Sequence, residues 1–186
     1  MKLTFAVAST FLLFCALAAG AQNVTERLHV DATDAPRNIL HATLTIPVAP
    51  GPVTLVYPKW IPGNHRPTGP IQNLTGLHFM AAGRELEWQR DLVDMYAFHL
   101  QVPAGVNELQ AAYDTITYNG KSSLASSKVL DLLWNQMVLY PQGAATDNVR
   151  VTASVRLPEG WKFGTALTPM QQSGSAAEFQ TVSLTT

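Results

Sequence analysis

The chain has 186 residues, a formal net charge of −1 and only 13% charged residues, so it offers no electrostatic surface for nucleic acid or an anionic membrane. Its length and its hydrophobic content of 47% suffice for one domain with a buried core. Functions that depend on a strongly basic or acidic surface are therefore excluded.

The first 21 residues predict a signal peptide. The apolar run 3–17 follows a lysine, and Ala19-Gly20-Ala21 fits the small-residue pattern of a cleavage site, so we expect cleavage before Gln22. The run is shorter than the roughly 20 residues that a membrane span needs. Phe14 precedes Cys15, the only cysteine, where a lipoprotein signal would have a small residue. We expect a periplasmic or secreted protein with no stable membrane anchor and no disulfide.

Most of the remaining chain alternates apolar and polar residues with a period of two, which indicates half-buried β-strands. In chain order, this pattern or a hairpin pattern covers the segments 40–46, 77–80, 84–89, 96–102, 109–113 and 149–157. Ala81-Ala82-Gly83 joins the second segment to the third in hairpin fashion. The pattern predicts a single all-β domain over 22–186, built as an antiparallel β-sandwich or as curved sheets.

Two segments are less regular. Residues 128–140 are long enough for a helix and contain good helix formers, yet they fit two strand pieces around Asn135 equally well. We predict strand because the neighbouring segments are strands. The last residues, 177–186, alternate like a strand and then stop without a cap or a finishing turn, so we expect a domain that is incomplete at its carboxyl end.

Residues 57–70 predict a long, rigid loop. Four prolines and two glycines in fourteen residues prevent both a helix and a central strand. The loop carries a candidate surface for a neighbouring domain or a ligand, formed by Tyr57, Lys59, Trp60, His65 and Arg66. We interpret Trp60 as packing at the edge of the core, as most large aromatic residues do. The alternative is an exposed platform that binds a sugar or a partner.

The sequence contains no recognisable catalytic or metal-binding motif. Its five histidines are scattered singly, with neither His-Glu-x-x-His nor His-x-His. There is no Gly-x-Ser-x-Gly elbow, no cysteine nucleophile and no phosphate-binding glycine loop. Trp88, Trp134 and Trp161 lie in apolar segments and are expected in the core. We therefore expect no catalysis and no cofactor binding from this chain alone.

Three short motifs occur in a characteristic order. Residues 58–63 read Pro-Lys-Trp-Ile-Pro-Gly, residues 83–86 read Gly-Arg-Glu-Leu, and residues 157–161 read Leu-Pro-Glu-Gly-Trp. They resemble the Pro-x-Trp-x-Pro-Gly, Gly-x-x-Leu and Leu-Pro-x-Gly-Trp motifs of the glycyl aminopeptidase family, metallopeptidase family sixty-one. The matches follow the family order, and the resemblance extends roughly over residues 23–186.

This resemblance implies the N-terminal β domain of a thermolysin-like zinc aminopeptidase, which in the family precedes a helical catalytic domain and often a PDZ domain. The family's zinc ligands belong to the catalytic domain, so no catalytic or metal-binding role is transferred to this chain. Related aminopeptidases hold the substrate's amino terminus with Gln-x-Glu. The nearest candidate, Gln136-Met137-Val138, lacks the acid, so this role is not transferred either. The implied partners are the protein's own catalytic domain and a peptide substrate.

Two other classes of protein stay open. A free-standing exported β-sandwich would bind carbohydrate or peptide through the Trp60 loop, and a structural domain would have no ligand of its own. A peptidase fragment should expose apolar surface where its catalytic domain docks. A binding module should instead lose its ligand when Trp60 is replaced.

Overall fold

The computed structural model describes residues 24–117 and 124–186. The predicted signal peptide at 1–21, with Cys15 and the cleavage site before Gln22, lies outside the described residues. Every regular element in the described part is a β-strand or a short 3-10 turn, so the all-β prediction is confirmed. None of its helical turns is long and apolar enough to cross a membrane.

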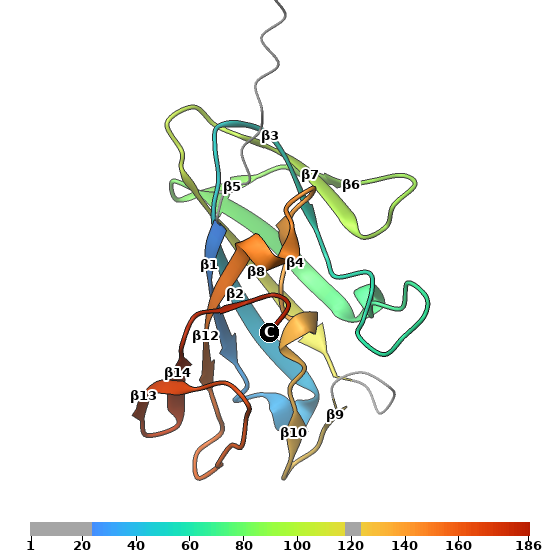
Figure 1. Cartoon of the computed structure of the whole chain (residues 1–186). Helices are drawn as coiled ribbons and strands as arrows, with labels where there is room; N and C mark the ends of the chain where they lie inside the picture. Colours follow the sequence, from blue (N-terminus) through green and yellow to red (C-terminus); the bar gives the residue numbers. More distant parts are fainter. Residues whose placement is uncertain (1–23, 118–123) are drawn as a thin grey trace, which may run out of the picture.

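Most strands form one large sheet with the order β13-β14-β12-β1-β2-β8-β4-β5, and β15 pairs with β12 beside it (Figure 1). The strands are β1 (Val24–Asp31), β2 (Ile39–Pro47), β4 (Leu74–Ala81), β5 (Arg84–Leu86), β8 (Glu108–Ile116), β12 (Val149–Arg156), β13 (Pro169–Ser173), β14 (Ala176–Phe179) and β15 (Val182–Ser183). The long strands β2, β4, β8 and β12 coincide with four of the predicted segments.

A smaller sheet with the order β11-β3-β7-β6 covers part of the large sheet (Figure 1). It contains β3 (Gly51–Val56), β6 (Trp88–Arg90), β7 (Ala97–Val102) and β11 (Tyr140–Pro141). The short strands β9 (Leu124–Ala125) and β10 (Leu130–Asp131) pair with each other. The 3-10 turns are η1 (Ala35–Arg37), η2 (Ile71–Asn73), η3 (Trp134–Gln136) and η4 (Thr146–Asn148).

One strand pair departs from the antiparallel arrangement. Strand β1 runs parallel to β12, with Val24 opposite Val149 and Asp31 opposite Arg156. Parallel neighbours need a long crossover connection. Here the connection is most of the domain, because β2 to β11 lie between the two strands in sequence. The first and last long strands are therefore neighbours inside the large sheet.

The hydrophobic core lies between the two sheets and forms one continuous cluster. On β2 every second residue is buried, with Leu40, Leu44 and Ile46 fully inaccessible. Trp88 joins the sheets because its ring meets Phe79 of β4 at 6.1 Å and Phe98 of β7 at 5.5 Å, both edge to face. Trp88, Trp134 and Trp161 all pack against this core and are half-buried.

The predicted hairpin between 77–80 and 84–89 is confirmed by β4 and β5. Its two central residues, Ala82 and Gly83, have φ values of 47° and 75°. A type I′ turn needs positive φ at both positions, and this turn has the twist that joins adjacent antiparallel strands.

The ambiguous segment 128–140 consists of two strand pieces, β10 and β11, on either side of η3. The Tyr57 hydroxyl donates a hydrogen bond to the Gln136 carbonyl at 3.1 Å, and the Tyr113 hydroxyl donates to the Met137 carbonyl at 2.6 Å. Tyr57 follows β3 and Tyr113 lies on β8, so both sheets hold this turn. The structure confirms the alternative with two strand pieces and excludes the long helix.

Candidate docking face

Residues 57–70 form a loop that is closed at its neck. The Gly69 N–H donates to the Lys59 carbonyl at 3.0 Å, and Trp60 pairs with Pro67 in an isolated β-bridge. A Cβ on Gly69 would lie 2.0 Å from the Pro58 carbonyl oxygen, so only glycine fits where the two ends of the loop approach each other. The prolines and this neck together fix the position from which Trp60 projects.

The loop residues singled out by the sequence take different positions. Tyr57 is 2% exposed and supports the loop from the core, while Lys59 is half-buried. Trp60 is 63% exposed, so the interpretation of this residue as a plug at the core edge is wrong. His65 and Arg66 are exposed in the outer part of the loop. Of the five residues, Lys59 contacts the turn at 91–95, and Trp60 borders a hollow at the side of the loop.

A second projection, the turn at 91–95 between β6 and β7, lies beside the loop (Figure 1). One oxygen of Asp91 accepts hydrogen bonds from the Val93 and Asp94 N–H groups at 2.8 and 2.7 Å, and the other lies 2.8 Å from His99 Nε2. The Asp94 N–H, followed by His99, lowers the pKa of Asp91 to about 2. The carboxylate of Asp91 therefore braces the turn from inside.

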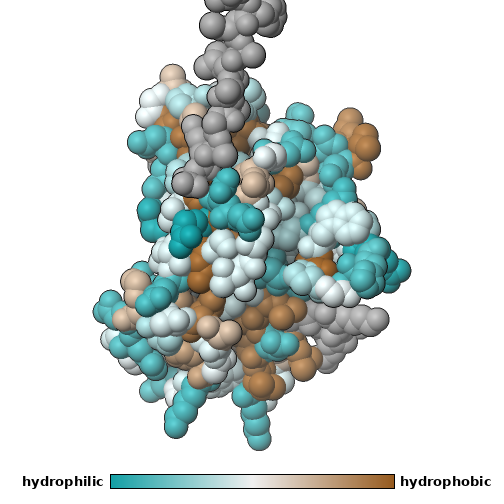
Figure 2. All heavy atoms as spheres, in the orientation of Figure 1, coloured by the Kyte–Doolittle hydropathy of each residue, from teal (hydrophilic) through white to brown (hydrophobic). Residues whose placement is uncertain are grey.

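This braced turn presents apolar side chains to solvent. Leu92 and Val93 are 101% and 96% exposed, and Met95 is 52% exposed. Figure 2 shows hydrophobic side chains projecting at this place, on the side of the molecule from which the 57–70 loop also projects. Leu92 and Val93 were not singled out from the sequence, although two adjacent apolar residues between two turn-forming aspartates are a usable signal.

An ion pair joins the loop to the turn. Lys59 Nζ lies 3.0 Å from Asp94 Oδ2 and 5.5 Å from the centre of the Tyr96 ring. The Lys59 ammonium is also the main cause of the lowered pKa of Asp94. The Tyr96 hydroxyl donates to the Gly69 carbonyl at 3.1 Å, which ties the start of β7 to the neck of the loop. Polar contacts thus tie the two projections to each other.

Trp60 also borders a hollow of 510 Å³ that is formed mainly by apolar side chains. Pro58, Trp60 and Pro62 line one side, and Val138 with Tyr140 lines another. Leu184, Thr185 and Thr186 complete it, so the last described residues lie beside the loop. We call the combined surface the docking face; its residues are Trp60, Pro62, Leu92, Val93, Tyr140 and Leu184.

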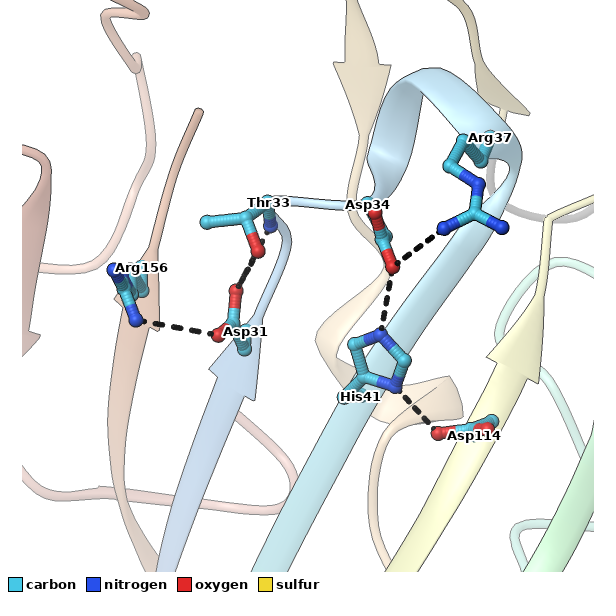
Figure 3. A network of polar contacts seen from close by, with 7 residues as sticks. All are labelled: Asp31, Thr33, Asp34, Arg37, His41, Asp114 and Arg156. Atoms are coloured by element: carbon cyan, nitrogen blue, oxygen red, sulfur yellow. Dashed lines mark hydrogen bonds and ion pairs between the residues drawn. The ribbon is translucent and has the colours of Figure 1, made fainter. Parts of the chain in front are cut away.

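His41 takes part in a small polar network. His41 lies between two carboxylates, with Nδ1 2.7 Å from Asp114 and Nε2 3.3 Å from Asp34, which also pairs with Arg37 at 3.4 Å (Figure 3). The hydrogen bond with Asp114 is the main reason why the pKa of His41 is raised. A neighbouring group links Asp31, Thr33 and Arg156 (Figure 3). These contacts fix η1 and the ends of β1 and β12. The described residues include no group of three that could hold a metal ion.

One acidic residue is buried in the core. Glu26 on β1 is fully inaccessible, and within the described part of the chain neither of its carboxylate oxygens has a hydrogen-bond partner. Desolvation raises its pKa to about 8, so the carboxyl is protonated at neutral pH. Glu26 was not singled out from the sequence, although the alternation along β1 places it on the same face as Val24, Leu28 and Val30.

Comparison with known proteins identifies a family and similar structures. The family described as the peptidase M61 N-terminal domain matches residues 27–186. An aminopeptidase N family protein from Idiomarina loihiensis has a similar structure, with a TM-score of 0.70 and 17% identity over 82% of this chain and 26% of that one. Leukotriene A4 hydrolase from Saccharomyces cerevisiae has a TM-score of 0.52 and 9% identity over 88% of this chain and 27% of its own. The chain thus spans about a quarter of their length. No curated protein matches the sequence.

Proposed function

Because the chain belongs to the family of peptidase M61 N-terminal domains, we propose that it is the non-catalytic N-terminal β domain of an exported zinc aminopeptidase-like protein. In this proposal the domain packs on a catalytic domain and shapes the access of peptide substrates to it. Zinc belongs to that catalytic domain, as the motif resemblance implies. Export, to the periplasm or the exterior, rests on the signal-peptide pattern at residues 1–21.

The observation that carries the proposal is the docking face. Trp60, Leu92 and Val93 expose large apolar side chains, and the contacts around Lys59 and Asp91 hold the backbone that carries them. Large exposed apolar side chains on neighbouring projections mark an interaction site, and a surface with a fixed backbone loses little conformational entropy when it is covered. A polypeptide that continued beyond Thr186 would leave the domain beside Trp60, within reach of this face.

The alternative is a free-standing exported binding module. It is favoured by the exposed indole of Trp60 at the edge of the 510 Å³ hollow, an arrangement suited to stacking on a sugar or an apolar peptide side chain. In that case the docking face would be a ligand site rather than a contact between domains.

The first experiment is to isolate the native polypeptide from its source cells and determine its intact mass. We expect a mass well above the 20.2 kDa of this chain, with peptides that contain His-Glu-x-x-His, and one bound zinc ion per polypeptide. A native mass equal to that of residues 22–186 would favour the binding module. Zinc-dependent peptide cleavage by residues 22–186 alone would contradict the non-catalytic role.

Two substitutions in the native polypeptide test the docking face. Trp60→Ala should weaken the contact between the domains by about 2 kcal/mol or more, as large aromatic residues at the centre of an interface do. Met170→Ala is the matched control, because Met170 is 58% exposed and lies on β13, outside the docking face. Hydrogen exchange of residues 57–70 and 91–95 should rise in the first variant only. Equal exchange in both variants would refute the assignment of the face.

A further inference from the structure

A second hollow lies on the other side of η3 from the docking face. It has a volume of 650 Å³ and lies between residues 128–134 and the loop that follows β12. Trp134 lines this hollow, whereas the next residue, Asn135, lines the hollow beside Trp60. We call it the aromatic pocket; the residues used below are Lys128, Trp134, Trp161, Lys162, Phe163 and Phe179.

The wall of the aromatic pocket is made of packed rings. Phe179 on β14 lies 5.7 Å from Trp134 and 5.7 Å from Phe163, with its ring nearly perpendicular to both. Phe179 is 1% exposed, so it anchors the two outer rings, which are only half-buried. Figure 2 shows hydrophobic surface near β10, on the border of this pocket. The rings therefore offer a fixed apolar surface rather than flexible side chains.

The rim of the aromatic pocket is positively charged. Lys128 lies in the segment before β10 and Lys162 in the loop after β12, so the two lysines reach the lining from different segments of the chain. Both lysines are exposed, and among the described residues neither Nζ takes part in an ion pair. Of the lining residues that the structure describes, Asp131 is the only acidic one. The lining thus contains two cations and one anion beside the aromatic rings.

We propose that the aromatic pocket binds an apolar side chain that carries a carboxylate next to it. A free N-acyl amino acid and the carboxyl-terminal residue of a peptide share this chemistry. The aromatic rings would cover the apolar group, and the two lysines would donate charge-assisted hydrogen bonds to the carboxylate. The volume lies in the range of small-molecule and peptide-residue sites. This inference goes beyond the proposed function and does not rest on it.

Calorimetric titration of residues 22–186 tests the site with two matched pairs of probes. The first pair is N-acetylphenylalanine and its neutral amide, and the second is a pentapeptide that ends in phenylalanine, with a free or an amidated carboxyl terminus. We expect each acid to bind about tenfold or more tightly than its amide, since the pairs differ only in the charged group. Tighter binding of the free-acid peptide than of N-acetylphenylalanine would identify a peptide end as the ligand. Equal or weaker binding of that peptide would identify the small acid.

Variants assign the binding to the pocket. The double substitution Lys128→Met and Lys162→Met keeps the aliphatic length of both side chains and removes both charges, and it should weaken binding of the acids by about tenfold. Arg84→Met is the control, because Arg84 is an exposed cation on β5. Unchanged thermal unfolding midpoints show that all the variants fold. The proposal is overturned if acid and amide bind equally, if no probe binds saturably, or if Arg84→Met has the same effect as the lysine substitutions.

Discussion

Glu26 is the residue whose replacement should change the stability of this domain in the most distinctive way. Its carboxyl is fully buried among apolar neighbours on the inner face of β1, without a hydrogen-bond partner in the described part of the chain. An ionised carboxylate in such a place is very unfavourable, so the group keeps its proton instead. Replacing it with glutamine preserves the shape and a polar group but removes the titration.

The pKa determines the sign and the size of the effect. Because the pKa of Glu26 rises from 4.5 to about 8 on folding, its full contribution to stability is present below pH 4.5 and is lost as the pH rises through 8. Between these values, the free energy of unfolding falls by about 1.4 kcal/mol for each unit by which the pH rises. The loss reaches about 3 kcal/mol at pH 7, a large fraction of the stability of an ordinary domain.

Urea unfolding between pH 5 and pH 8 measures this effect. Relative to the wild type, Glu26→Gln should gain about 3 to 4 kcal/mol of unfolding free energy over this range. Glu87→Gln is the control, because Glu87 is exposed between β5 and β6, and its difference from the wild type should stay nearly constant. A difference for Glu26→Gln that does not change with pH would refute the reasoning. It would mean that Glu26 is ionised and compensated in the folded protein.

Two further substitutions test the rigidity of the docking face. Gly69→Ala should destabilise the domain by about 1 to 3 kcal/mol and loosen the 57–70 loop, since the new Cβ would meet the Pro58 carbonyl at 2.0 Å. Gly164→Ala is the control, because a Cβ there meets nothing within 4 Å, and it should leave the thermal unfolding midpoint nearly unchanged. Asp91→Ala should speed amide hydrogen exchange of Val93 and its neighbour while leaving the β4–β5 hairpin unchanged, and equal exchange throughout would show that the carboxylate does not brace the turn.

The strands could be predicted because the burial pattern of a half-buried strand is visible in its own sequence. In 40–46 and 149–157 the side chains alternate between the core and the outer face, and this alternation is visible in the sequence without any knowledge of the partner strands. The turn at Ala82 and Gly83 also depends only on residues that are neighbours in the sequence. The parallel pairing of β1 with β12 is not local, because it depends on how most of the chain folds between them.

The docking face could be predicted only in part. The prolines and glycines of 57–70 indicate a rigid loop, but burial decides whether its tryptophan points inward, and burial depends on distant residues. In the structure the core takes Tyr57, which is 2% exposed and donates to the Gln136 carbonyl, whereas Trp60 in the same loop is 63% exposed. The partnership of Lys59 with Asp94 joins two loops that are separated by several strands, so no local pattern reveals it.

The short turn η3 connects the two surfaces for which we propose roles. Its consecutive residues Trp134 and Asn135 line different hollows, one aromatic and one beside Trp60. A single 3-10 turn has little stability of its own, and here the hydroxyls of Tyr57 and Tyr113 hold the backbone at Gln136 and Met137 from both sheets. Because the same two hydrogen bonds position both hollows, a change that moves η3 would alter the docking face and the aromatic pocket together. A change at the rim of either hollow would leave the other intact.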